Sequence, residues 1–249
     1  MTTDSRVLAA LHDEIMDILE KPHFARAEEL TGYCARWAVP ERIQEVVDCV
    51  RRGTRILREC SGESRRHPLG FDKFVLLADR QYEIRLHVWQ AGTVARAEHI
   101  HNHRFSFSSS AVTGRIDVST YDMYGTNDTC DTREVTSSGM PMVRYRETWI
   151  DDQRAYVFDV PELVRVRARE SWSLTAGSGY FLQADTLHRV SWRGPEPAAT
   201  LVVKIPADRR HTTVLVPPLT KPPAGAQRDF FTPDDTSVLL GRFLKLLRA

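Results

Sequence analysis

Three histidines stand close together in the chain, at His99, His101 and His103. On a β-strand, residues i and i+2 point to the same face, so two such imidazoles can bind one metal ion at about 2.0–2.1 Å. A third ligand must come from elsewhere, and His188 is the natural candidate. Three buried imidazoles are costly without a partner, whereas an exposed run on an edge strand needs none. The cluster therefore predicts a metal site, and spacing alone leaves open which two of the three histidines join His188.

The first 66 residues are predicted to form a helical segment. Apolar residues recur at helical spacing between Val7 and Leu19, a second helix is expected over Arg26 to Ala38, and a third is expected to begin at Pro40. Each helix has a single apolar stripe, so these helices are expected to pack on another part of the protein.

The pattern changes to period two from about Phe71 to Val216, and residues 67–216 are predicted to form one β-domain. Tyr82 to Trp89 alternates cleanly. Shorter strands are expected in three further stretches, Val164–Arg169, Ala155–Val160 and Thr200–Ile205. Many short strands with few helical stretches favour a mostly β fold, an antiparallel sandwich or barrel.

Residues 217–249 are predicted to be a proline-rich linker and a last helix. Thr232 is the expected N-cap, with Pro233 at the first helical position. The apolar face of this helix is expected to consist of Leu239, Leu240, Phe243, Leu244 and Leu247.

Composition narrows the function classes. The 249 residues carry 34 Lys and Arg against 33 Asp and Glu, a net charge of +1, so no basic field points to nucleic acid or an anionic membrane. No apolar run approaches the roughly 18 residues of a membrane span, and the N-terminus lacks a signal-peptide pattern, so the cytoplasm is expected. The cysteines are expected to be free thiols, three on helices and one in a loop: Cys34, Cys49, Cys60 and Cys130.

The spacing around the histidines resembles the two motifs of the cupin superfamily. His101-x-His103, three residues, Phe107, six residues and Gly114 reproduce the end of the first motif. Gly177 and His188 stand at the separation of the second motif, whose proline, glycine and asparagine places hold Gln183, Asp185 and Trp192. The resemblance implies a cupin-type antiparallel β-barrel (jelly roll) with His101, His103 and His188 as ligands, and His99 beside the metal site.

Phe107 occupies the place of the motif's glutamate, and a site of three histidines resembles the cysteine dioxygenase (thiol dioxygenase) branch of the cupins. Further similarity to that branch lies in Phe71-Asp72-Lys73, Trp89, Leu187-His188-Arg189-Val190 and Glu196-Pro197-Ala198. The resemblance covers roughly residues 71–206.

Departures from that branch concern the substrate. Lys73 stands in the place of the arginine that holds the substrate carboxylate in that branch. A lysine ammonium is a point charge, whereas an arginine guanidinium can donate two parallel hydrogen bonds to a carboxylate. The branch's Ser-His-Tyr trio falls on Thr200, Val202 and Lys204, and its crosslinking cysteine falls at or near Phe107. The scaffold and the metal are therefore expected to persist with a substrate other than free cysteine.

The alternation of side chains along each strand predicts which polar residues line the inside of the barrel. Arg85, His87 and Trp89 share one strand face, and Lys204 alternates against Leu201, Val203 and Ile205, so it should point inward. We expect the substrate to bind to Lys73, Arg85, Trp89 and Phe107, and His87 and Lys204 to take part in catalysis. The alternatives place Arg85 and His87 in solvent, or pair the cations internally with Asp79, Glu83 or Asp185.

These features predict a non-haem Fe(II)-dependent oxygenase or oxidase that acts with O2 on a small anionic molecule, carboxylate-bearing and amino-acid-like or a thiol. The alternatives are a redox-inactive zinc cupin acting as lyase, isomerase or hydrolase, and a non-catalytic ligand-binding cupin. Imidazole suits Fe, Zn, Mn and Ni alike. The stripes of the terminal helices leave open whether they cap the barrel or form a homodimer.

Overall fold

The computed structural model describes residues 3–67, 70–92, 98–125, 139–150, 155–159, 161–192, 194–207, 209, 211–220 and 230–248. Four helices precede the strands and one follows them: α1 (Thr3–Glu20), α2 (His23–Trp37), α3 (Pro40–Arg52), α4 (Thr54–Glu63) and α5 (Pro233–Leu246). The sequence predicted three helices before the strands. The fourth arises because the chain turns at Gly53, which caps α3 and precedes α4.

Thirteen strands form two antiparallel sheets in the described residues. The first sheet has the order β1-β2-β3-β12-β5-β10: β1 (Arg65–Arg66), β2 (Asp72–Ala78), β3 (Glu83–Trp89), β12 (Ala198–Pro206), β5 (Phe105–Thr113) and β10 (Gly179–Leu182). The second has the order β13-β4-β11-β6-β9-β7-β8: β13 (His211–Val216), β4 (Ile100–His101), β11 (Leu187–Ser191), β6 (Arg115–Gly125), β9 (Glu162–Thr175), β7 (Met140–Ile150) and β8 (Ala155–Phe158). The predicted fold class, mostly β with antiparallel sheets and helices at both ends, is confirmed.

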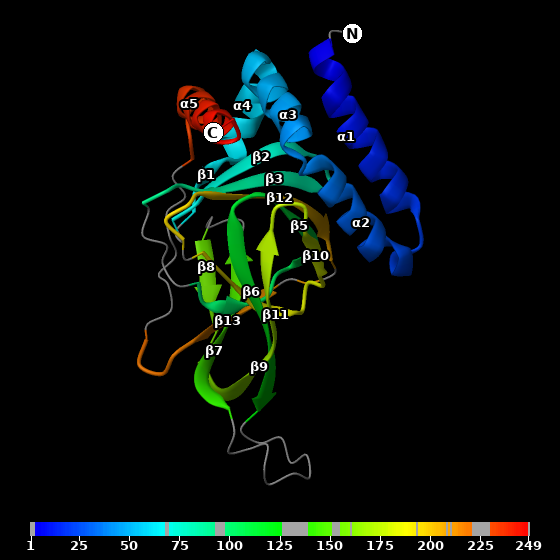
Figure 1. Ribbon diagram of the computed structural model, residues 1–249. Coiled ribbons are helices and arrows are strands. Elements are labelled where there is room, and N and C mark those ends of the chain that lie inside the picture. Colours follow the sequence, from blue (N-terminus) through cyan, green and yellow to red (C-terminus); the bar gives the residue numbers. More distant parts are fainter. Residues whose placement is uncertain are drawn as a thin grey trace.

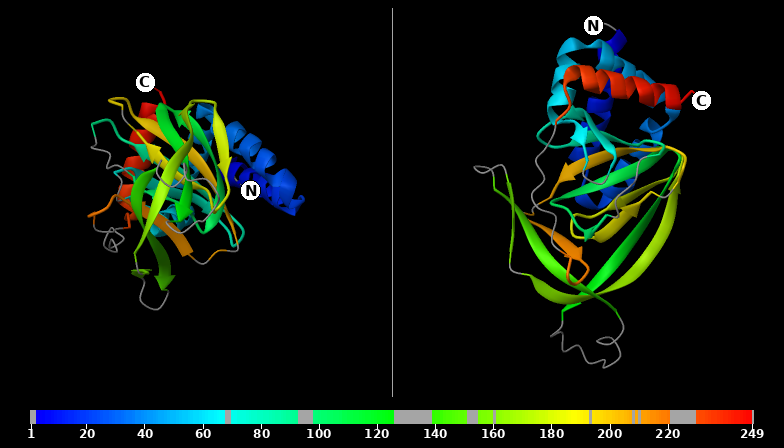
Figure 2. Two further views of the ribbon diagram at one scale, coloured as in Figure 1. Left: turned by 90° about the horizontal axis from the view of Figure 1, so that it is seen from below. Right: turned by 90° about the vertical axis from the view of Figure 1, so that its left-hand side faces the viewer.

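The second sheet closes on itself because β13 also pairs with β7, from His211 opposite Thr148 to Val216 opposite Val143. The long strands β6, β7 and β9 curve away from the helices, as the right-hand view of Figure 2 shows. An apolar cluster lies between these strands and β4, β11 and β13, and its buried members are Ile100, Met142, Val164, Val166, Leu187 and Leu215. This cluster holds β4, which carries His101, in place.

The helices cover the outer face of the first sheet, at the top of Figure 1. Ile84, Leu86 and Val88 of β3 are fully buried and belong to the same core cluster as residues of α1, α2, α3, α4 and α5. Because side chains alternate along a strand, Arg85, His87 and Trp89 face the other way, into the space between the sheets. The predicted alternation of β3 is therefore confirmed, and Arg85 and His87 do not lie on a solvent face.

Gly114 makes the tight turn between β5 and β6. Its φ is +71°, in the left-handed region, and an added Cβ would collide with the backbone of Pro197 and Ala198. Glycine is therefore required here for both conformation and space.

The last helix begins as predicted. The Thr232 side chain accepts a hydrogen bond from the Asp235 N–H, the Asp235 carboxylate accepts one from the Thr232 N–H, and Pro233 is the first helical residue. Leu240, Phe243 and Leu244 are buried against the other helices. The predicted linker lies mostly outside the described residues, which end at Thr220 and resume at Phe230.

Three cysteines, Cys34, Cys49 and Cys60, are buried free thiols on helices, as predicted. Cys130 lies outside the described residues. No helix in the described part of the chain has the length and apolar character needed to span a membrane.

Candidate metal centre and the polar lumen

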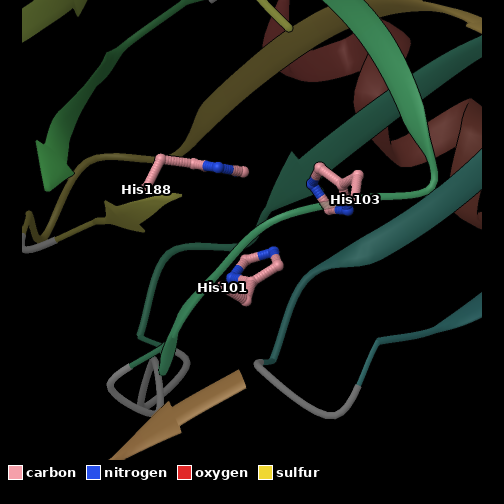
Figure 3. Close-up of side chains that lie close together, drawn as sticks. All are labelled: His101, His103 and His188. Atoms are coloured by element: carbon pink, nitrogen blue, oxygen red, sulfur yellow. The ribbon is translucent and has the colours of Figure 1, made fainter. Parts of the chain in front are cut away.

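His101, His103 and His188 lie together, and one ring nitrogen of each lies within 4.8 Å of the others. The ring centroids of His101 and His103, and of His101 and His188, are 4.7 Å apart, and those of His103 and His188 are 4.9 Å apart. Figure 3 shows the rings of His101 and His103, on one segment of the chain, and the ring of His188, on another, gathered around a common space. These are the three residues that the cupin resemblance selects.

The chain brings His101 and His103 together by a route that the sequence did not predict. β4 ends at His101, so the two histidines are not neighbours on one strand face. Asn102, between them, is buried; its side chain accepts a hydrogen bond from the Thr213 N–H at 2.7 Å and donates one to the Asp185 carbonyl at 3.3 Å. Asn102 thus anchors the crossing from the second sheet to the first.

Backbone carbonyls set the tautomers of two of these histidines. His101 Nδ1 lies 2.9 Å from the carbonyl oxygen of His99, and His188 Nδ1 lies 3.0 Å from that of Thr186. Because a carbonyl can only accept, each Nδ1 carries the proton and each Nε2 keeps a free lone pair. His99 therefore contributes to the centre through its backbone.

Burial keeps the imidazoles of His103 and His188 neutral, as metal binding requires. Burial, then the neighbouring His101, lowers the pKa of His188 to about 3 and that of His103 well below its ordinary value. Three convergent imidazole donors fit a divalent first-row metal ion.

Aromatic rings form the wall beside the histidines. The ring of Phe105 stacks on His103 with 4.5 Å between centroids. Phe107 lies edge-on to His103 at 5.4 Å and tilted to His188 at 5.6 Å. Phe107, predicted to bind substrate, is therefore in contact with two of the three histidines, and Phe105 was missed by the sequence analysis.

Lys73 and His87 lie side by side on the inner face of the first sheet, opposite each other in the β2–β3 register. Lys73 is a buried residue, and its ammonium group has no acid within ion-pair distance among the described residues. Burial, and then the nearby Arg85, lowers the pKa of Lys73 to about 6. His87 Nε2 is also buried without a hydrogen-bond partner among the described residues. Phe71 lies 4.8 Å from His87 and 4.9 Å from Trp89, between ring centroids.

Arg85 and Lys204 point into the lumen but share one acid. Lys204 Nζ lies 2.6 Å from one Glu83 oxygen, and Arg85 Nε donates to the other at 2.7 Å. Both cations also lie over the ring of Phe105, at 5.3 Å for the guanidinium carbon and 4.7 Å for the ammonium. Lys204 points inward, as predicted. Lys204 and Arg85 both pair with Glu83, so for these two cations the alternative of internal pairing is correct. Lys73 is the exception.

Two further residues of this region were missed. Glu98 is half-buried, and one of its oxygens lies 3.8 Å from His101 Nε2. Burial raises the pKa of Glu98, while His101 and the Val190 N–H act in the other direction. His67 stacks on Phe71 at 4.3 Å; burial, then Arg65, His101 and Lys73, lowers its pKa to about 3. An acid three residues before His101 was the available signal for Glu98; none marked His67.

No model of a known protein family matches this sequence, and no curated protein matches it. Among solved structures, the protein TT1209 from Thermus thermophilus is similar with a TM-score of 0.33 and 17% identity, over 57% of this chain and 89% of that one. Hydroquinone 1,2-dioxygenase from Sphingomonas sp. TTNP3 gives a TM-score of 0.29 and 14% identity, over 53% and 63%. Bacillus subtilis oxalate decarboxylase gives 0.33 and 12%, over 61% and 30%. Likenesses of this size do not assign a family or an activity. The fold and the site define a two-sheet antiparallel β protein with a three-histidine candidate metal centre.

Proposed function

We propose that this protein is a non-haem Fe(II)-dependent oxygenase or oxidase of the cysteine-dioxygenase-like cupin type, acting on a small carboxylate-bearing substrate. The observation that carries the proposal is the convergence of His101, His103 and His188, with two Nε2 lone pairs set by backbone carbonyls. An Fe(II) ion held by these imidazoles would supply binding and activation of O2 together with the substrate.

Lys73 is proposed to hold the substrate carboxylate. Its buried amine has a pKa of about 6 and no acid partner among the described residues, so an anionic ligand beside it would favour the ammonium form and pair with it. His87, its neighbour on β3, is proposed to accept or return a proton at Nε2.

Arg85 and Lys204 are proposed to act through the field that they produce. With the single carboxylate of Glu83, this group of three keeps a net charge of about +1, which attracts an anion to the lumen. Lys204 remains a proposed catalytic residue on this basis. Phe105, Phe107 and Trp89 are proposed to form the walls that exclude water from the bound substrate.

The experiment begins with protein purified without added metal, followed by metal analysis. O2 consumption is then measured with a panel of amino acids, other small carboxylates and thiols after anaerobic loading with Fe(II). Fe(II)-dependent, substrate-dependent O2 consumption that is lost in His188→Ala supports the proposal. Stoichiometric zinc with no O2 consumption for any member of the panel would favour a lyase, isomerase or hydrolase instead.

A further inference from the structure

Three basic side chains lie in one row across the inner face of the first sheet. Lys73 of β2 is opposite Arg65 of β1 and opposite His87 of β3 in the antiparallel registers. Residues directly opposite each other on neighbouring strands share one face of the sheet and have Cβ atoms about 4.5–5.5 Å apart. Lys73 is only 6% exposed, and His87 Nε2 is buried without a hydrogen-bond partner among the described residues. The row therefore places a buried amine beside a buried imidazole nitrogen.

The surroundings of Lys73 favour its unprotonated form. Burial lowers the pKa of Lys73 to about 6, and Arg85 and Arg65 act in the same direction. Glu83 and Glu63 act in the opposite direction, but Glu83 already accepts a hydrogen bond from Arg85. At pH 7 most copies of this side chain are therefore free amines, whereas an exposed lysine is unprotonated in fewer than about one molecule in 1,000.

A free amine held in apolar surroundings beside another cation is a nucleophile toward carbonyl carbon. Phe71, two residues before Lys73, and Trp89 are buried and provide apolar surfaces on this side of the sheet. The Phe71 ring lies 4.8 Å from His87 and 4.9 Å from Trp89, between centroids. An ordinary ion-paired lysine lacks this reactivity because a proton occupies its lone pair. Lys73 thus combines a buried position, an available lone pair and a neighbouring group that can move a proton.

We propose that Lys73 is a nucleophile that captures an aldehyde or ketone as an imine, and that the preferred carbonyl compound is a 2-oxo acid. The nitrogen lone pair attacks the carbonyl carbon, and a proton moves from nitrogen to the former carbonyl oxygen. The resulting hydroxyl leaves as water when the C=N bond forms, so one amine and one carbonyl compound give one imine and one water. No oxidant or reductant is needed. His87 is the group placed to carry the proton.

The charge of the lumen favours a carboxylate on the same molecule. Arg85 and Lys204 share the single carboxylate of Glu83, so this group keeps a net charge of about +1 that attracts an anion. The inference goes beyond the proposed function. A plain carboxylate selects the ammonium form of Lys73, whereas a carbonyl group reacts with the amine form, so the two ligands use different protonation states of one side chain.

The test traps the imine by reduction. The full chain, with a chelator present, is incubated at pH 7 with sodium cyanoborohydride and formaldehyde, pyruvate or methyl pyruvate, and the modified peptides are mapped by mass spectrometry. We expect formaldehyde, the smallest carbonyl probe, to modify Lys73 about 10-fold or more faster than the exposed Lys245. Pyruvate should modify Lys73 about 10-fold or more faster than its neutral methyl ester.

Variants separate the amine from the charge and from the proton carrier. Lys73→Arg keeps a cation without a nucleophilic amine and should give no adduct at this position, and Lys73→Met should behave in the same way. The matched control Lys245→Arg should leave the Lys73 adduct unchanged. His87→Ala should slow imine formation with pyruvate about 10-fold or more, and added imidazole should restore part of the rate. An unchanged rate in His87→Ala would remove His87 from the proton transfer.

The peptide map of the wild type gives an answer even if a variant fails to fold. Modification of exposed lysines with Lys73 left unmodified, even by formaldehyde, would overturn the inference. Equal rates for pyruvate and methyl pyruvate would overturn the assignment of a 2-oxo acid. Because the experiment uses neither metal nor O2, its failure is distinguishable from failure of the proposed function, which is measured by metal content and O2 consumption.

Discussion

The carboxylate of Glu83 lies 2.6 Å from the ammonium of Lys204, across the pairing of β3 with β12. The same carboxylate accepts from Arg85, two residues further along β3. Burial by itself would raise the pKa of Glu83, but Arg85 and Lys204 lower it to about 2. One acid therefore holds two of the three lumen cations away from the space where a substrate would bind.

Replacing Glu83 with glutamine should destabilise the protein. Arg85 and Lys204 have side chains only 14% and 22% exposed, so both would be left poorly solvated beside each other. We expect the free energy of unfolding in urea to fall by about 1–3 kcal/mol. In the control Glu29→Gln, which removes the exposed partner of Lys21, the loss should not exceed about 1 kcal/mol. Equal losses in the two variants would contradict this account.

The contribution of Glu83 to stability should vanish in acid. Its pKa is about 2 in the folded protein against an ordinary value of 4.5, so its contribution is fully present above about pH 4.5 and is lost as the pH falls toward 2. The measurement is the difference in free energy of unfolding between wild type and Glu83→Gln from pH 6 to pH 3. A difference that stays constant below pH 4 would show that Glu83 is not the titrating group.

Lys73→Met should stabilise the protein near neutral pH. The variant replaces a buried amine that has no acid partner by an apolar side chain of similar length. We expect this replacement to raise the free energy of unfolding by on the order of 1–3 kcal/mol. Because the folded pKa of Lys73 is about 6 and its ordinary value is 10.5, the unfolded chain binds an extra proton between these values, and wild-type stability rises with pH across that window. The advantage of Lys73→Met should therefore shrink as urea unfolding is repeated from pH 7 to pH 9.

The same Lys73→Met variant should lose substrate affinity while keeping its metal. Removing one partner of a buried charge pair costs about 2–5 kcal/mol of binding free energy. Once a substrate is known from the O2-consumption panel, titration calorimetry gives its affinity and metal analysis serves as the control. Unchanged affinity would remove Lys73 from the proposed carboxylate site.

Metal content should depend on His188 but not on the side chain of His99. His188→Ala removes one of three convergent donors and should abolish stoichiometric binding of a divalent ion, whereas His99→Ala keeps the backbone carbonyl that fixes His101. In the wild type, free metal at 100 times its Kd should raise the free energy of unfolding by about 2.7 kcal/mol, and a chelator should reverse this. If metal were lost in His99→Ala but retained in His188→Ala, the proposed register of the histidine ligands would be wrong by two residues.

Much of the fold follows from local patterns in the sequence. The alternation of β3 and β12 determined which side chains face the helices and which face the lumen, because a strand's side chains point to opposite faces whatever it pairs with. The capping residues Thr232 and Pro233 determined the start of α5, because capping depends on neighbours in the chain. The histidine spacing predicted a metal site, and the resemblance to the cupin motifs, not spacing alone, selected the three imidazoles that meet.

Only the tertiary structure decided which lumen charges remain unpaired and what else borders the histidines. Glu83 neutralises Lys204 because β12 pairs with β3 at that register, over 121 residues of sequence separation. Glu98 reaches the centre because its side chain bonds to β11, a strand about 90 residues further along the chain. Asn102 takes the chain from one sheet to the other through bonds to β13 and to the turn before β11. Such contacts depend on strand order and register, which the residues of one segment do not specify without the segments that pack against it.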